Sequence, residues 1–269
     1  MSDNPTSARQ SKLAVSSDNV DRRGFLGGVG AIAAIMLTPG VALAGLAKAR
    51  STDEPVTDAQ RWGMLIDTNR CVRGCGACVS ACGKENGLVS YGRPQTDVQW
   101  IRKVTVRNKI HDSGSESGYI RHQISLPLMC QHCQYPPCVD VCPTGASFRR
   151  ADGLVLVDRH ICIGCRYCMM ACPYKARSFA HEIANGQKPH APRGKGTVEA
   201  CTLCVHRIDQ DPIKAPACVE ACAAQGNGAM VFGDLKDPNS SISLKLKDYP
   251  STALRADLGL YPGVRYQGI

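Results

Sequence analysis

The stretch Cys162-Ile-Gly-Cys165-Arg-Tyr-Cys168-Met-Met-Ala-Cys172-Pro173 decides the fold of this chain. Gaps of two, two and three residues separate its four cysteines, and a proline follows the last one. Such short gaps put consecutive thiols on one tight loop, and the three-residue gap is consistent with about one turn of helix before the fourth thiol. The stretch therefore predicts several thiols gathered round one compact centre.

Three further groups of four account for the rest of the sixteen cysteines in the 269-residue chain. We call the stretch above group three. The others are Cys71, Cys75, Cys78 and Cys82 (group one); Cys130, Cys133, Cys138 and Cys142, followed by Pro143 (group two); and Cys201, Cys204, Cys218 and Cys222 (group four). Group one departs from the common spacing because its first gap is three residues long, and group four contains a long internal gap.

Three kinds of protein use so many cysteines: disulfide scaffolds, structural zinc modules and iron-sulfur proteins. Disulfides staple distant loops and do not require tight quartets. Zinc is usually held by two separate pairs of ligands, often with histidine. Group three matches the cysteine run of bacterial ferredoxins without deviation. The spacing therefore predicts iron-sulfur clusters. Cluster binding is expected to supply folding energy because the unfolded chain has no preformed site, and the low aromatic content of 5% leaves the core to be organised by something other than large side chains.

The last cysteine of each group is predicted to serve a neighbouring cluster, as in two-cluster ferredoxins. Groups two and three are arranged for this exchange, and groups one and four form the second pair by elimination. The predicted ligands are Cys71, Cys75, Cys78 and Cys222 for cluster 1; Cys201, Cys204, Cys218 and Cys82 for cluster 2; Cys130, Cys133, Cys138 and Cys172 for cluster 3; and Cys162, Cys165, Cys168 and Cys142 for cluster 4. This nesting predicts an α+β fold of two interlocked ferredoxin-like units.

The formal charge of +9 at pH 7 does not by itself indicate nucleic acid as a partner. An oxidised [4Fe-4S] core with four thiolates carries about −2, so four clusters contribute roughly −8 and leave the loaded protein nearly neutral. The sequence contains no nucleic-acid motif, catalytic triad order, phosphate loop or dinucleotide fingerprint. We interpret the basic side chains as compensation for cluster charge.

The N-terminus resembles a twin-arginine export signal, with Arg22-Arg23-Gly-Phe-Leu before an apolar stretch from Gly27 to Leu46. Small residues at Ala42-Leu-Ala44 predict residues 1–44 as a cleaved signal peptide. Cleavage after Ala49, retention as a membrane anchor and a chance arginine pair stay open, although several glycines weaken a membrane helix. The signal predicts a periplasmic protein at the outer face of the cytoplasmic membrane.

The rest of the chain divides into two predicted regions. Residues 61–222 form a tandem [4Fe-4S] domain, in which 71–82 and 201–222 make one cluster pair and 130–172 the other. Val98–Ile110 predicts a strand or hairpin inserted between groups one and two, and Gly153–Asp158 a short strand. Residues 223–269 are rich in turn residues and predict an extended C-terminal tail packed against a partner.

Several motifs resemble the four-cluster ferredoxin subunits of the DMSO-reductase type, from about residue 61 to the end. The most specific are Cys130-Gln-His-Cys-Gln-Tyr-Pro-Pro-Cys138 and the group three stretch, and Phe232-Gly-Asp-Leu235 and Pro262-Gly-Val-Arg-Tyr266 resemble the family's C-terminal signature. Some members replace the second cysteine of group three by tryptophan and hold a [3Fe-4S] centre. Cys165 is intact, so the resemblance implies four [4Fe-4S] clusters.

The resemblance implies a non-catalytic electron-transfer subunit that is membrane-associated through its complex. Its expected partners are a multi-span quinone-reactive membrane subunit and, as a further candidate, a periplasmic multihaem cytochrome. With its export signal and closing motif, the chain most resembles the iron-sulfur subunit of sulfur-metabolism complexes of the DsrMKJOP type. Nitrite-reductase and polysulfide-reductase complexes are the alternatives. An enzyme with an open iron site is a less favoured alternative, since it would need a cluster with only three cysteine ligands.

Four other residues near the ligands allow two interpretations each. His132 and His206 are placed to donate hydrogen bonds that raise a cluster's potential, or they are partly solvated loop residues. Lys175 and Arg177 offset cluster charge or steer a partner, or they are ordinary exposed charges.

Overall fold

The computed structural model describes residues 54–111 and 119–269, all within one compact unit, Ala47–Ile269. The predicted signal peptide, residues 1–44, lies outside the described residues. The strands are β1 Trp62–Asp67, β2 Ile101–His111, β3 Tyr119–Met129, β4 Ser147–Arg149, β5 Val155–Val157, β6 Arg177–Phe179, β7 Val198–Ala200, β8 Met230–Asp234 and β9 Val264–Gln267. The helices are α2 Ala77–Asn86, α3 Pro137–Asp140, α4 Tyr167–Ala171, α5 Val205–Gln210, α6 Ala217–Gln225, α7 Ser241–Asp248 and the 3-10 helix η1 Ala256–Leu258.

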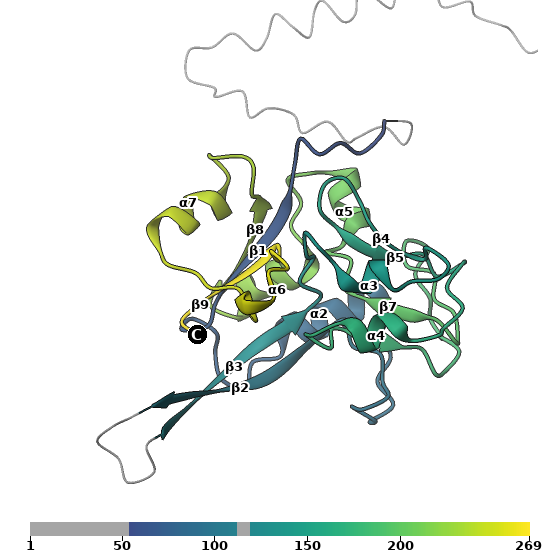
Figure 1. The fold of residues 1–269 in the computed structure, drawn as a ribbon, viewed down its shortest axis with the longest axis horizontal. Helices are drawn as coiled ribbons and strands as arrows, with labels where there is room; N and C mark the ends of the chain where they lie inside the picture. The colour runs from purple at the N-terminus through teal and green to yellow at the C-terminus, as the bar shows by residue number, and fades with distance from the viewer. Residues whose placement is uncertain (1–53, 112–118) are drawn as a thin grey trace, which may run out of the picture. The chain divides into compact units, whose positions relative to one another are not determined.

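The helices that carry cysteines pack in two pairs (Figure 1). Helix α2 of group one packs against α6 of group four, and α3 of group two packs against α4 of group three. These helices are short, as a ligand loop closed by a three-residue gap requires. Segments separated by more than a hundred residues therefore lie side by side, and the fold contains both helices and small antiparallel sheets.

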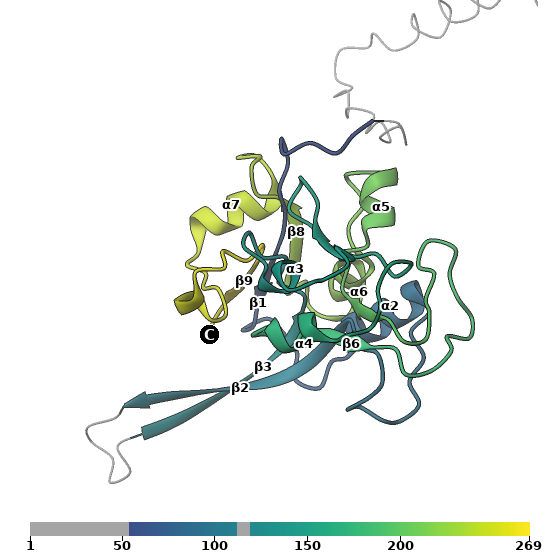
Figure 2. The same ribbon diagram turned by 45° about the vertical axis from the view of Figure 1, so that its right-hand side comes forward.

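A long hairpin lies between cysteine groups one and two in the sequence. Strands β2 and β3 pair antiparallel from Ile101 and Met129 at the base to His111 and Tyr119. The hairpin projects away from the other elements (Figures 1 and 2). The strand or hairpin predicted for Val98–Ile110 is confirmed, and β5 confirms the short strand predicted within Gly153–Asp158.

The C-terminal region corrects the prediction of an extended tail. Strand β1 lies in the centre of a three-stranded sheet, antiparallel to β8 and parallel to β9, so residues 223–269 supply both of its neighbours. Helix α7 packs on β8, and Trp62 stacks on Phe232 across the sheet with ring centroids 5.2 Å apart. The turn residues that suggested a tail form the short connections between these elements.

The C-terminal region also contacts the group two loop. The backbone N–H of Gly263 donates to the carbonyl of Gln131 at 2.9 Å, and the N–H of Gln134 donates to Leu260 at 3.0 Å. Tyr266 is fully buried, and its hydroxyl donates to the carbonyl of Pro127 at 3.1 Å. Residues 260–266 thus brace the loop that carries Cys130 and Cys133.

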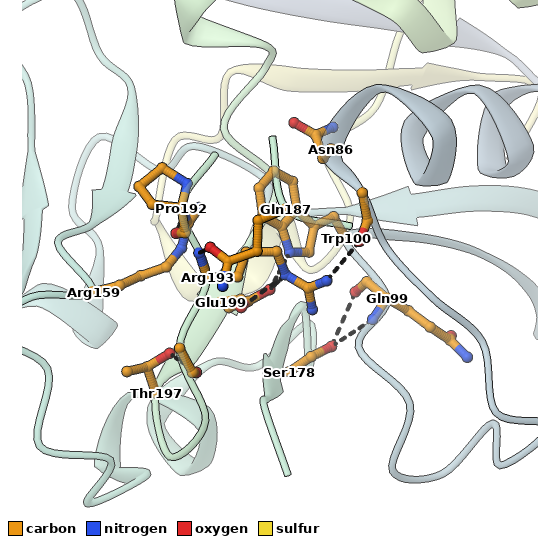
Figure 3. Close-up of polar contacts among 12 residues, drawn as sticks. Asn86, Gln99, Trp100, Arg159, Ser178, Gln187, Pro192, Arg193, Thr197 and Glu199 are labelled. Carbon is orange, nitrogen blue, oxygen red and sulfur yellow. Dashed lines mark hydrogen bonds and ion pairs between the residues drawn. The ribbon is translucent and has the colours of Figure 1, made fainter. Parts of the chain in front are cut away.

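A buried ionic contact joins the middle of the chain to the base of the hairpin (Figure 3). The Glu199 carboxylate, on β7 and fully buried, accepts from Arg193 Nε at 2.9 Å and from Trp100 Nε1 at 3.0 Å. Arg193 also donates to the carbonyl of Gly87 at the end of α2, at 2.9 Å. The contact fixes α2 and the start of β2 against the group three region. No helix in the described part of the chain combines the length and hydropathy of a membrane span.

Candidate iron-sulfur site

Each of the four cysteine groups opens with a loop in which the same backbone position is left-handed. In every group the residue directly before the second cysteine has a positive φ: Gly74 (79°), His132 (45°), Gly164 (70°) and Leu203 (52°). A non-glycine residue in this conformation costs roughly 1–2 kcal/mol, so the surroundings hold His132 and Leu203 in place. Group one keeps the turn in spite of its longer first gap.

One cavity is lined by four cysteines that come from groups two and three. These are Cys142, Cys162, Cys165 and Cys168, the set predicted to hold cluster 4. Backbone N–H groups donate to two of the thiols, from Ser147 to Cys142 Sγ and from Val198 to Cys162 Sγ, both at 3.4 Å. The strands β4 and β7 therefore present their backbone to the cavity.

A second cavity is lined by four cysteines that come from groups one and four. These are Cys82, Cys201, Cys204 and Cys218, the set predicted to hold cluster 2. The packing of α2 against α6 brings Cys82 to the three cysteines of group four. The N–H of Leu203 donates to Cys201 Sγ at 3.4 Å, so the left-handed loop turns its backbone donors towards a thiol.

Electrostatic interactions link seven of the other eight cysteines to one another. Burial raises the pKa of Cys133 to about 12, and the neighbouring thiols of Cys130, Cys138 and Cys172 add to this shift. Burial also raises the pKa of Cys78, to which Cys222 and Cys71 contribute. Cys75 lies on the loop between Cys71 and Cys78. The structure thus places Cys172 with the first three cysteines of group two, and Cys222 close to group one.

The arrangement of the thiols argues against a disulfide scaffold and against zinc. All sixteen cysteines are free. In the described part of the chain, the group of metal-ligand atoms within 4.8 Å of one another consists of Glu85, His190 and His206, and it contains no cysteine. A single zinc ion would draw four sulfurs to about 2.3 Å from one centre. Sulfurs held in that way would all lie within 4.8 Å of one another, and in the described residues no group of three or more cysteine sulfurs does.

The buried thiols have the chemistry that an iron-sulfur core requires. Burial raises the pKa of Cys82 and Cys130 to about 12 and raises the pKa of Cys201 and Cys218 well above the ordinary value. Such thiols stay protonated at neutral pH unless a metal stabilises the thiolate. Thiolate is also the soft ligand that iron-sulfur cores prefer. The donor set and the cavities therefore fit [4Fe-4S] clusters, which supply one-electron redox chemistry.

Two cationic side chains contact cysteine sulfurs directly. Arg177, which is 4% exposed, donates through Nη2 to Cys138 Sγ at 3.0 Å. Lys103, on β2, donates through Nζ to Cys71 Sγ at 2.8 Å. The exposed-charge interpretation is therefore wrong for Arg177, whereas Lys175 is exposed. Sequence reasoning missed Lys103 because β2 approaches group one only in the folded chain.

The two histidines singled out in the sequence differ in their surroundings. His132 is 1% exposed and accepts through Nδ1 from the N–H of Val155 at 3.0 Å, so the partly solvated interpretation is wrong for it. Burial lowers the pKa of His132 to about 3, which keeps the ring neutral. His206 lies on α5, 2.8 Å from Glu85 Oε1, and stacks on His190 with ring centroids 3.8 Å apart. His206 thus has a carboxylate as its hydrogen-bond partner.

Two family models, each described as a 4Fe-4S dicluster domain, match residues 70–146 and residues 122–235. The chain is 42% identical to the Hdr-like menaquinol oxidoreductase iron-sulfur subunit 1 of Archaeoglobus fulgidus, over 92% of this chain and 97% of the relative. It is 37% identical to a tetrathionate reductase subunit of Salmonella typhimurium, over 87% and 84% of the two chains. It is 36% identical to the protein NrfC of Escherichia coli K12, over 90% and 92%.

The cysteine loops, the cavities and the two dicluster domains define a ferredoxin-like electron carrier that binds four [4Fe-4S] clusters. The relatives narrow the class. The chain belongs to the family of iron-sulfur subunits of oxidoreductase complexes that includes the tetrathionate reductase relative and NrfC. It is an electron-transfer subunit, and catalysis belongs to other subunits of such complexes.

Proposed function

We propose that this chain relays single electrons between a quinone-reactive, multi-span membrane subunit and a second periplasmic redox subunit, for which a multihaem cytochrome is one candidate. The observation that carries the proposal is the gathering of cysteines from distant groups into sets of four, two of which line cavities. Four one-electron centres within one small unit can pass electrons from one to the next. The sixteen cysteines supply four ligands for every cluster, so no iron is left open to bind a substrate.

The proposed ligand sets follow the exchange of last cysteines between groups. Cluster 1 is held by Cys71, Cys75, Cys78 and Cys222; cluster 2 by Cys201, Cys204, Cys218 and Cys82; cluster 3 by Cys130, Cys133, Cys138 and Cys172; and cluster 4 by Cys162, Cys165, Cys168 and Cys142. The pairing of α2 with α6 and of α3 with α4 supports these sets. The two ferredoxin-like units would then interlock, with the unit of groups one and four enclosing that of groups two and three.

Group three offers a surface on which the membrane subunit would dock. Of the sixteen cysteines, Cys165 is the exposed one. Three large apolar side chains of the same segment are exposed: Ile163 (68%), Tyr167 (55%) and Met170 (65%). An exposed apolar patch beside a redox centre fits a partner interface, since it excludes water and brings a second centre close to the cluster.

Sulfur metabolism in a complex of the DsrMKJOP type is the assignment that we favour. Two relatives carry names that refer to sulfur oxyanions: the tetrathionate reductase relative, and a sulfite dehydrogenase subunit of Allochromatium vinosum, which is 37% identical over 76% of this chain. The menaquinol oxidoreductase in the name of the A. fulgidus relative supports a quinone pool as the redox partner, with menaquinol as electron donor or menaquinone as electron acceptor.

The twin-arginine signal supports a periplasmic location, because that route exports folded proteins with their cofactors already bound. Residues 22–46 carry this part of the proposal through their sequence alone. An Arg22→Lys, Arg23→Lys variant should accumulate in the cytoplasm of the native host with its clusters assembled. Periplasmic recovery of this variant would contradict the export route.

Purification of the tagged chain from native membranes under anaerobic conditions tests the relay. A multi-span membrane subunit and a haem-stained subunit should accompany the chain. Addition of a reduced menaquinone analogue should bleach the cluster absorbance of the complex, and the isolated chain should not respond. A chain that is recovered alone from gently solubilised membranes, or a complex that a quinol cannot reduce, would contradict the proposed partners.

A further inference from the structure

Arg177 is a buried cation that lies among cysteine side chains. Its Nη2 donates to Cys138 Sγ at 3.0 Å and to Ser147 Oγ at 2.8 Å, and Arg177 and Cys168 line the same cavity. The guanidinium therefore lies directly against Cys138, a predicted ligand of cluster 3.

The cysteines next to Arg177 belong to different ligand sets. Cys138 lies in the set of cluster 3 and Cys168 in the set of cluster 4. Arg177 also lines the cavity that Cys142, Cys162, Cys165 and Cys168 surround. One guanidinium therefore lies between the two sets.

The guanidinium has further hydrogen-bond donors that are not paired. In the part of the chain that the structure describes, the buried Nε and Nη1 of Arg177 have no hydrogen-bond partner. Unpaired buried donors are costly, so a native site normally supplies an acceptor. The sulfides and thiolates of a [4Fe-4S] core are acceptors that fit, and hydrogen bonds to the sulfurs are among the factors that set a cluster's reduction potential.

We propose that Arg177 is a positioning residue that raises the reduction potentials of clusters 3 and 4 together. The inference rests on the ligand sets proposed above. Each reduction adds one negative charge to a cluster, and a fixed cation beside it stabilises the reduced form more than the oxidised form. Because one cation faces both clusters, it also lessens the repulsion between the two when both are reduced. Arg177 thereby makes this pair a sink that accepts electrons readily.

The test is an EPR-monitored redox titration of anaerobically purified wild type and Arg177→Gln. The glutamine keeps a hydrogen-bond donor and loses the charge. At a fixed potential, the ratio of oxidised to reduced cluster should rise at least tenfold for two of the four signals, which is 59 mV for a one-electron couple. The other two signals should not move. Arg177→Lys, which keeps the charge, should recover most of the shift, and the exposed control Lys175→Gln should leave all four potentials unchanged.

The titration separates this role from the proposed function. Four signals with unchanged potentials in Arg177→Gln would overturn the role of Arg177 and leave the four-cluster relay intact, whereas fewer than four clusters in the wild type would contradict the relay itself. A shift of all four signals, or of one alone, would also overturn the pairing. If Arg177→Gln does not assemble four clusters, Ser147→Ala carries the test, because it frees the guanidinium from its hydroxyl acceptor. The potentials of clusters 3 and 4 must then shift together, because the guanidinium loses a contact that fixes its position, and unchanged potentials would refute the proposal.

Discussion

The left-handed residue before the second cysteine is the smallest unit of this site. Two groups place glycine there, Gly74 and Gly164, and two place larger residues, His132 and Leu203. His132 and Leu203 are both almost fully buried, so packing and the hydrogen bond of His132 to Val155 hold the strained backbone. The conformation therefore follows from the loop, and glycine eases it without being required in every group.

Substitution of the two glycines should separate backbone strain from steric clash. A Cβ at Gly164 would lie 2.1 Å from the carbonyl oxygen of Gly196, whereas a Cβ at Gly74 would meet nothing within 4 Å. Gly164→Ala should lose cluster 4, so iron should fall from about sixteen to about twelve atoms per chain. Gly74→Ala should keep all four clusters, because strain alone costs about 1–2 kcal/mol. Full iron content in Gly164→Ala would contradict the packing of this loop.

The buried carboxylate of Glu199 is a second residue on which the structure depends. Glu199→Gln removes the charge that neutralises Arg193, which is itself 8% exposed. Leaving a buried charge unpaired should lower the free energy of unfolding by about 3–5 kcal/mol. The midpoint of anaerobic guanidinium unfolding, followed by cluster absorbance, measures the loss.

The matched control is an exposed ion pair of the same chain. Arg255 and Asp257 lie 2.8 Å apart, and their side chains are 55% and 61% exposed. Arg255→Gln should leave the midpoint of unfolding close to that of the wild type, because water screens an exposed ion pair. Equal midpoints for Glu199→Gln and the wild type would show that the buried pair contributes nothing.

At the scale of elements, the cysteine loops could be predicted from the sequence and the sheet around β1 could not. The ligands of one loop lie a few residues apart, so their spacing carries the signal. Strands β8 and β9 are short and pair with a strand more than 160 residues earlier, where no local pattern records the partner. Close packing of the sheet also depends on small residues, since a Cβ at Gly63 would lie 2.5 Å from Leu235 Cδ1. The turn-rich composition alone suggested a tail.

The same reason explains the contacts that sequence reasoning missed. Trp100, Arg193 and Glu199 meet from segments about a hundred residues apart, and Lys103 reaches Cys71 from the hairpin. None of these residues stands in a motif. Arg177 was singled out because it follows group three, and its burial between two cysteine sets was visible only in the fold.

Removal of strand β9 should show that the C-terminal region is part of the body. A chain that ends at Gly259 lacks the contacts of Leu260 and Gly263 with the group two loop, and β1 loses its parallel neighbour. Cluster 3 should then be lost or become labile, with a lower iron content and faster bleaching in air. A truncated chain with wild-type iron and unchanged bleaching would indicate that residues 260–269 serve only a partner.

At the scale of the whole molecule, the proposed docking surface predicts a loss of electron transfer without a loss of clusters. Met170→Glu places a charge on the apolar patch beside Cys165, where Met170 is 65% exposed. The rate of reduction by quinol in the native complex should fall at least tenfold, because a buried unpaired charge weakens an interface. Leu244→Glu on α7, also exposed, is the control and should reduce normally. A wild-type rate of reduction in Met170→Glu would show that the membrane subunit docks on another surface.

The measurement that tests the central claim most directly is the iron, acid-labile sulfide and zinc content of the anaerobically purified chain, taken with low-temperature EPR of the reduced protein. Two dicluster domains and sixteen free cysteines predict about sixteen iron and sixteen sulfide per chain, no stoichiometric zinc, and signals from four reduced [4Fe-4S] clusters. Iron near zero with stoichiometric zinc, or a full complement of iron with a cluster whose signal responds to added substrate, would contradict it.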